Sequence, residues 1–262
     1  MAEPDQPGST PADVELDLGR AARRGYPEAI YCEGKSVDQV RDIARRIKAF
    51  HAGAGAGESV AARSDMGASA GGEFGTQTTL FTRADAERAA AVLEVLPDAV
   101  HDPSARLLAW PPAVPTPSGG LVVVAAAGTS DLPVARKAEL TARYRGRRTE
   151  LVMDVGVAGL HRVLGRLDLL RRAAAVVVVA GMDGTLPSVV AGLVSAPVVA
   201  CPTSVGYGAA FDGLAPLLAM LNACSPAWGS STSTTVTAQA ISRRRSPPPL
   251  PRSRPDHPCR SD

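Results

Sequence analysis

The stretch VVVVAGMDGTLPS (Val176–Ser188) decides the fold, because it joins a β-branched apolar run to a turn and then to a helix start. An uninterrupted apolar run of this length is typical of a strand buried on both faces of a parallel sheet. Two further stretches repeat the pattern, LVVVAAAGTSDLP (Leu121–Pro133) and PVVACPTSVGYGA (Pro197–Ala209). A fourth strand is expected at 149–154, and helices are expected at 132–144, 187–193 and 214–224. This alternation predicts an α/β fold with a three-layer parallel sheet and right-handed crossovers.

Small polar residues follow the predicted strands at the points where the strands end. In a parallel sheet these carboxyl ends lie at one edge, and ligands bind outside that edge. The sequence therefore predicts a ligand site there. The residues that the pattern brings to this edge are Ser130, Asp131, Asp183, Ser188, Thr203 and Ser204.

The composition is that of an ordinary globular protein. Hydrophobic residues make up 45% of the 262 residues and charged residues 21%, with a net charge of +2. Aromatic residues are only 4% of the chain, so base stacking and a nucleic-acid partner are not expected. The apolar runs are too short to cross a membrane, and the N-terminus lacks the features of a signal peptide. With four scattered cysteines and no CxxC motif, we predict a reduced, cytoplasmic protein.

The order of segments predicts four regions. Residues 1–16 are expected to be a disordered leader, and 17–118 a small N-terminal α+β region with helices at 36–50 and 84–96. The first of these helices is expected to be capped by Ser36. The run AGAGAG (Ala52–Gly57) is interpreted as a flexible loop, since no strand precedes it and no Lys-Ser/Thr follows it. A Pro/Gly-rich linker leads to the main domain at 119–228, and 229–262 is an aberrant, disordered tail.

The sequence of the tail indicates a shifted reading frame. The peptide Val-Val-Asn-Ile-Asp-Asn-Gly-Tyr, encoded GTC GTC AAC ATC GAC AAC GGT TAC, becomes Ser-Ser-Thr-Ser-Thr-Thr-Val-Thr when translation starts one nucleotide late. That is the sequence from Ser230 to Thr237. We hypothesise that a final strand and helix were lost to a frame change near Trp228. Sequencing the encoding DNA tests this, because a shifted frame without an apolar strand would contradict it.

Several long motifs, occurring in one order, resemble the LarB family, the pyridinium-3,5-biscarboxylic acid mononucleotide synthases of nickel-pincer cofactor biosynthesis. These motifs are GYPEAIYCEGKS (Gly25–Ser36), AGTSDLPVA (Ala127–Ala135), MDVGVAGLHR (Met153–Arg162), VVAGMDGTLPSVVAGL (Val178–Leu193), PTSVGYGAAF (Pro202–Phe211) and LLAMLNAC (Leu217–Cys224). The part after Leu121 also resembles, more distantly, the flavodoxin-like domain of PurE, the aminoimidazole ribonucleotide (AIR) carboxylase. The chain departs from the LarB pattern at Asp183, where the family usually has Glu, and in lacking the family's NIDNG strand.

The resemblance implies a carboxylase and hydrolase that converts nicotinic acid adenine dinucleotide and CO2 to the biscarboxylic mononucleotide, with release of AMP. It also implies Mg2+ as a cofactor, CO2 or bicarbonate as co-substrate, and a homo-oligomer, for which an octamer is expected. A PurE-type carboxylase or mutase acting on aminoimidazole ribonucleotide is the first alternative. An inactive, truncated nucleotide-binding product is the second.

Four residues are candidates for catalysis. Cys224 is the candidate nucleophile, because a thiolate adds to an electron-poor pyridinium ring and also leaves readily; the alternative is a buried structural cysteine. Asp183 is a candidate base or Mg2+ ligand, or else a turn residue. His161 and Asp154, which flank the GVAG turn, are candidates for the base or for a carboxylate-binding group. Cys201, at the end of an apolar strand, is predicted to be a core residue.

The remaining candidates concern nucleotide binding. Gly128, Thr129, Ser130 and Asp131 open a predicted helix, whose free N–H groups favour a phosphate, although Ser and Asp are also common helix caps. The loop residues Thr203, Ser204, Gly206, Tyr207 and Gly208 are expected to close on the nucleotide. Ser188 completes this group at the end of the AGMDGTLPS motif. Lys35 is a candidate phosphate partner, the alternative being an ordinary solvated lysine.

Overall fold

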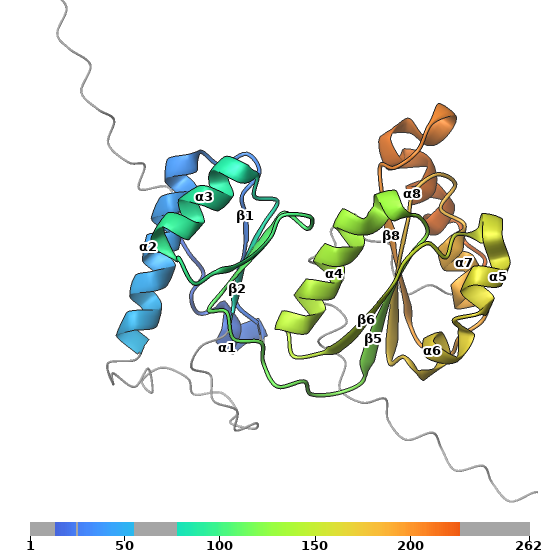
Figure 1. Ribbon diagram of the computed structural model, residues 1–262, viewed down its shortest axis with the longest axis horizontal. Helices are drawn as coiled ribbons and strands as arrows, with labels where there is room; N and C mark the ends of the chain where they lie inside the picture. The colour runs from blue at the N-terminus through green and yellow to red at the C-terminus, as the bar shows by residue number, and fades with distance from the viewer. Residues whose placement is uncertain (1–13, 25, 55–77, 226–262) are drawn as a thin grey trace, which may run out of the picture.

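A computed structural model describes residues 14–24, 26–54 and 78–225, which form two sheets with helices packed against them (Figure 1). The N-terminal sheet has the strand order β1-β2-β4-β3. Strands β1 and β2 are parallel, and the two other pairs are antiparallel. Its strands are β1 (Ala29–Tyr31), β2 (Thr79–Thr82), β3 (Val100–Asp102) and β4 (Leu107–Trp110). Three helices accompany it: α1 (Arg20–Arg24), α2 (Val37–Ala54) and α3 (Ala86–Val95).

Helix α2 begins where the sequence predicts, because Ser36 and Gln39 cap it reciprocally. The Ser36 hydroxyl accepts the N–H of Gln39 at 3.1 Å, and the Gln39 side-chain oxygen accepts the N–H of Ser36 at 2.9 Å. The helix continues to Ala54, so the first three residues of the expected AGAGAG loop are helical. The rest of that loop lies outside the described residues. Val14 and Leu16, from the expected leader, pack against the core that α2 and α3 form with the sheet.

The second sheet is parallel throughout and has the order β6-β5-β7-β8. Helix α4 (Leu132–Tyr144) covers one face, and four shorter helices cover the other, which confirms the three-layer α/β fold. The strands are β5 (Leu121–Ala126), β6 (Arg148–Val152), β7 (Ala175–Ala180) and β8 (Val198–Pro202). The shorter helices are α5 (Leu160–Leu164), α6 (Leu167–Arg172), α7 (Leu186–Ala191) and α8 (Leu214–Leu221).

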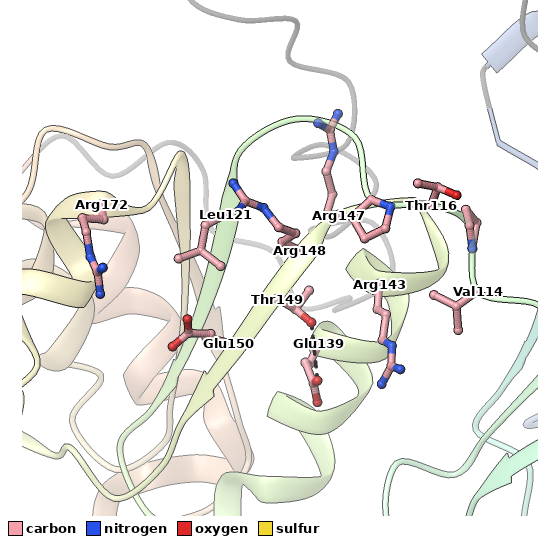
Figure 2. Close-up of a pocket in the computed structure, with 12 residues that line it drawn as sticks. Val114, Thr116, Leu121, Glu139, Arg143, Arg147, Arg148, Thr149, Glu150 and Arg172 are labelled. Carbon is pink, nitrogen blue, oxygen red and sulfur yellow. Dashed lines mark hydrogen bonds between the residues drawn. The ribbon is translucent and has the colours of Figure 1, made fainter.

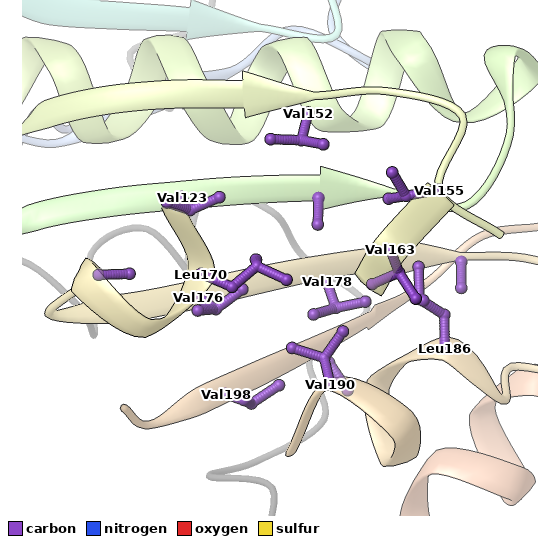
Figure 3. Packing of buried hydrophobic residues seen from close by; sticks show 14 of the residues in the cluster. Val123, Val152, Val155, Val163, Leu170, Val176, Val178, Leu186, Val190 and Val198 are labelled. Atoms are coloured by element: carbon purple, nitrogen blue, oxygen red, sulfur yellow. The ribbon is translucent and has the colours of Figure 1, made fainter. Parts of the chain in front are cut away.

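The apolar runs that decide the fold form the interior of this sheet. Every residue of β7 is buried. Its side chains alternate between the two faces, so Val176 and Val178 join the core under the short helices (Figure 3), while Val177 and Val179 face α4. This double burial explains why the sequence shows a continuous apolar run rather than an alternating one.

Two expected boundaries shift in a way that affects the site. The last helix was expected to include Cys224 but ends at Leu221, so Cys224 lies beyond it. Strand β6 ends at Val152, which leaves Asp154 in the following loop.

Strand β8 lies at the end of the described sheet, beside the position where a further strand would pair. The expected final strand and the tail lie outside the described residues.

Helix α4 joins the two sheets (Figure 1). Leu140 and Tyr144 on α4 pack against Leu80, Leu107 and Ala109 of the N-terminal sheet, in one apolar cluster. The opposite face of α4 packs against the second sheet through small residues such as Ala135 and Ala138. The N-terminal domain is therefore fixed against the same helix whose N-terminus lies at the carboxyl edge of the second sheet.

Candidate active site

The loops after β7 and β8 are held together at the carboxyl edge of the second sheet. The Met182 N–H donates to the Val205 carbonyl at 2.7 Å, and the Thr203 N–H donates to the Ala180 carbonyl at 3.0 Å. Gly181 allows this approach, because a Cβ there would lie 2.1 Å from the Val205 oxygen. The predicted convergence of these two loops is confirmed, and glycine is required where they meet.

Asp131 connects the loop after β5 to the loop after β8. Its carboxylate accepts the Gly128 N–H at 3.0 Å and the Thr203 hydroxyl at 2.7 Å, and its side chain is buried. Burial raises the pKa of Asp131, although both hydrogen bonds lower it. A desolvated carboxylate of this kind marks a candidate functional position. Both carboxylate oxygens are engaged by the protein, so Asp131 positions the turn that begins α4 while Thr129 and Ser130 stay exposed.

Asp183 is exposed in the loop after β7. Its Oδ1 accepts the Thr185 N–H at 3.1 Å, and within the described residues its Oδ2 has no hydrogen-bond partner. The loop also lies against the first turn of α8, because a Cβ at Gly184 would come within 2.7 Å of the Pro216 carbonyl. An exposed carboxylate of this kind is suited to Mg2+, which keeps several waters and binds through one or two carboxylates and substrate phosphates.

The loop after β6 brings Asp154 and His161 to the same edge of the sheet, but not into contact through a hydrogen bond. Asp154 has a left-handed backbone (φ 58°), and its carboxylate lies 2.6 Å from the guanidinium of Arg162. His161 is exposed in the first turn of α5. The Asp154 carboxylate is therefore paired with an arginine, whereas the exposed imidazole of His161 has no hydrogen-bond partner among the described residues.

The three cysteines in the described residues differ in accessibility. Cys224 is exposed, whereas Cys32 and Cys201 are buried. Burial raises the pKa of Cys201 to about 12 and that of Cys32 to about 12, so neither forms a thiolate at neutral pH. The core prediction for Cys201 is confirmed. Cys224 remains as the exposed thiol, although α8 lies between it and the loop that carries Asp183.

The other predicted binding residues take different positions. Tyr207 is 81% exposed beside Gly208, whose φ of 61° suits glycine. Ser204 and Gly206 are exposed in the same loop, and Ser188 is half-buried in α7. Lys35 belongs to the N-terminal domain, where its carbonyl accepts the Nε–H of Arg88 at 2.7 Å. The structure thus gathers these candidates along one edge of the second sheet, apart from Lys35, which lies in the turn after β1.

Sequence reasoning missed a group of charged residues where the N-terminal domain meets α4. Glu33, Arg83 and Arg106 come from the N-terminal domain, and Lys137 comes from α4. They are spread over more than a hundred positions and belong to no motif, so only the packing of the two domains reveals them.

A wide groove of about 920 Å3 lies at the opposite end of the second sheet (Figure 2). Leu121 and Arg148, the first residues of β5 and β6, line it together with Arg143, Arg147 and Arg172. The labelled arginine side chains diverge rather than point to a common position (Figure 2). The groove therefore lies away from the polar loops, and the candidate site stays at the carboxyl edge.

Within the described residues, no set of three or more His, Cys, Asp or Glu side chains is arranged to hold a metal ion. No helix in the same part of the chain is both long and apolar enough to cross a bilayer.

Comparison with known proteins finds two family matches along the chain. Residues 12–53 match the LarB/PurE-like N-terminal domain, and residues 121–241 match AIR carboxylase, a match that extends past the boundary expected at 228. An uncharacterized protein of Methanocaldococcus jannaschii is 31% identical over 215 residues, which cover 81% of this chain and 75% of the relative. Similar solved structures are Treponema denticola PurE, at 20% identity and a TM-score of 0.38, and a PurE2 variant from the same organism, at 21% and 0.37. They cover 45% of this chain and 75% and 74% of their own chains, respectively. The chain belongs to the LarB family, with an N-terminal LarB-type domain followed by a PurE-like carboxylase domain.

Proposed function

We propose that this protein carboxylates nicotinic acid adenine dinucleotide and cleaves its phosphoanhydride, forming pyridinium-3,5-biscarboxylic acid mononucleotide and AMP for nickel-pincer cofactor biosynthesis. The exposed thiol of Cys224, on a chain with an AIR carboxylase domain, is the observation that carries this proposal. A PurE-type reaction on aminoimidazole ribonucleotide needs neither this thiol nor the N-terminal LarB-type domain.

The chemistry explains why a thiol is required. A pyridinium ring is electron-poor and does not attack CO2, but addition of the Cys224 thiolate converts it to a neutral dihydropyridine. The enamine carbon of this ring then forms a C–C bond to CO2. A base removes the proton from that carbon, and the ring electrons expel the thiolate and restore the pyridinium. Separately, water adds to phosphorus and the bridging P–O bond breaks to release AMP.

The polar loops supply the remaining roles. We assign the proton transfer to Asp183 or His161, which are both exposed at the carboxyl edge, and assign phosphate binding to the Gly128–Ser130 turn at the start of α4. The loop with Ser204, Gly206, Tyr207 and Gly208 covers the nucleotide. If Asp183 holds Mg2+ instead of taking the proton, the ion would neutralise charge on the phosphates.

The direct test is incubation with nicotinic acid adenine dinucleotide, 13C-bicarbonate and Mg2+, followed by mass spectrometry. We expect AMP and a mononucleotide that carries the labelled carboxylate. Carboxylation of aminoimidazole ribonucleotide instead would support the PurE-type alternative. If neither substrate is converted, the result would support the second alternative, an inactive, truncated protein. The frame-restored chain is assayed in parallel to test that alternative.

Asp183→Asn is expected to lower the rate constant of carboxylation about 100-fold or more while changing the dinucleotide affinity less than threefold. The amide keeps the size of the side chain and an oxygen for the Thr185 N–H, but it removes the negative charge. Single-turnover kinetics separates the two effects. Weakened binding with an unchanged rate constant would make Asp183 a binding residue. Asp212→Asn, in the loop before α8, is the matched control.

Exposed apolar residues on α8 and on the segment just before it support the proposed homo-oligomer. Phe211, Leu218 and Leu221 are 70%, 55% and 65% exposed, which is unusual for large apolar residues on one short segment. We expect light scattering to give the mass of an octamer, and Leu218→Glu to reduce that mass. A wild-type protein with the mass of a single chain would contradict the proposed homo-oligomer.

A further inference from the structure

The N-terminal domain meets α4 through a charged cluster, which consists of Tyr31, Glu33, Arg83, Arg106 and Lys137. Glu33 lies at its centre: its Oε2 accepts hydrogen bonds from Arg83 and from the Tyr31 hydroxyl, each at 2.6 Å. An Arg106 nitrogen lies 3.8 Å from the other carboxylate oxygen. The hydrogen bonds from Tyr31 and Arg83 lower the pKa of Glu33 to about 2, so the carboxylate is ionised at neutral pH.

Lys137 brings a third cation to this cluster from α4. Burial lowers the pKa of Lys137, and the positive charges of Arg83 and Arg106 lower it further, while Glu33 and Cys201 act in the opposite sense. The adjacent residue of α4, Arg136, pairs with Asp102 of β3 at 2.9 Å, so this turn of the helix lies against the N-terminal domain. Lys137 lies in the second turn of α4, which begins at the carboxyl edge of the second sheet.

The cluster has more positive than negative charge. Arg83 and Arg106 lie beside the carboxylate of Glu33, and Lys137 adds a third positive charge nearby. The neighbouring carboxylate of Asp85 is already engaged by Arg88, whose N–H donates to it at 2.9 Å. The side chains of Arg83, Glu33 and Arg106 are each more than two-fifths exposed, so an anion has access to them. A cluster of partly exposed cationic side chains of this kind is suited to bind an anion.

The two arginines are held in an unfavourable backbone conformation. Arg83 and Arg106 both adopt left-handed conformations, with φ of 54° and 50°, which are unfavourable for residues other than glycine. They are also joined to each other: the Arg106 guanidinium donates to the Arg83 carbonyl at 3.1 Å, and the Ala84 N–H donates to the Arg106 carbonyl at 3.1 Å. Backbone strain that the surrounding structure maintains is concentrated at functional sites.

We propose that Arg83, Arg106 and Lys137 form an anion subsite that binds the phosphate of the adenylate half of the dinucleotide. Guanidinium groups bind phosphate oxygens in pairs, and the lysine adds a point charge from the opposite domain. This inference rests on the proposed function for the identity of the ligand. It gives the N-terminal domain a direct part in the site, where the leaving AMP is held.

The subsite is tested by titration calorimetry with AMP and with inorganic phosphate, neither of which requires turnover. Arg83→Gln and Lys137→Gln, one from each domain, are each expected to weaken AMP binding about tenfold or more. Arg46→Gln, which removes an arginine paired with Asp42 on α2, is the matched control and should leave the affinity unchanged. Glu33→Gln keeps an acceptor for Arg83 but removes the competing charge, so it should tighten AMP binding.

The outcomes separate this inference from the proposed function. AMP affinity that is lost in both cation variants supports the subsite, even if the wild-type protein forms no carboxylated product. Wild-type affinity in a folded Lys137→Gln protein overturns the subsite, even if the dinucleotide is turned over. The AMP subsite would also be overturned if the variants weaken binding of inorganic phosphate but AMP does not bind at all. The cluster would then be a site for a simple ion and not for a nucleotide. Thermal melting establishes that each variant is folded.

Discussion

Replacing Cys224 with alanine is expected to abolish formation of the carboxylated mononucleotide, with a loss of roughly 10³-fold or more and no change in melting temperature. Without the thiol, the pyridinium ring has no nucleophile to convert it to a dihydropyridine, and carboxylation stops before the C–C bond forms. Stability should not change, because Cys224 is exposed and lies beyond the end of α8. Mass spectrometry of the product and thermal melting are the two measurements.

The serine variant and a neighbouring position complete this experiment. Cys224→Ser should be nearly as inactive as the alanine variant, because a hydroxyl is a far weaker nucleophile at neutral pH. Ser225→Ala, at the next residue, should retain full activity. Alkylation with iodoacetamide should modify Cys224 and spare Cys32 and Cys201, which are buried. Retained turnover in Cys224→Ala would remove this residue from the mechanism.

Replacing Gly181 with alanine is expected to destabilise the protein by about 3 kcal/mol and to reduce activity strongly. The added Cβ would lie 2.1 Å from the Val205 carbonyl and 2.6 Å from the Thr203 hydroxyl, so the loops after β7 and β8 must separate. Their separation breaks the hydrogen bond from Met182 to Val205 and moves Asp183. The melting temperature should fall by roughly 6–12 °C.

Gly53 offers a control with the same substitution. It lies in α2, and a Cβ there would meet nothing within 4 Å. Alanine is a better helix former than glycine, so Gly53→Ala should leave the melting temperature unchanged or raise it slightly. An unchanged melting temperature in Gly181→Ala would show that the two loops can move apart freely, contrary to the close packing described above.

The second sheet could be predicted from the sequence because its signals are local. Buried parallel strands such as β7 appear as continuous apolar runs, and Pro133 and Pro187 mark the helix starts that follow. The polar residues at the strand ends follow from the same pattern. Helix α4 occupies its predicted range of 132–144 for this reason.

The N-terminal sheet could not be predicted in the same way. Strand β3 has only three residues, and β2 and β4 have four each, too short for a clear period. Their stability comes from pairing with one another and from packing on α4, contacts that join residues far apart in the sequence. The charged cluster around Glu33 was missed for the same reason. The engagement of Asp131 with Thr203, seventy-two positions away, likewise depends on tertiary structure alone.

The position of α4 also affects how the protein unfolds. Because this helix packs against both sheets, neither sheet can lose its order without exposing apolar residues across the contact, such as Leu80 of β2 or Leu140 of α4. The linker at 111–120 therefore does not act as a hinge between independent units. Calorimetry should record one cooperative transition for the two sheets together, and a chain cut within the linker should yield halves that associate rather than separate.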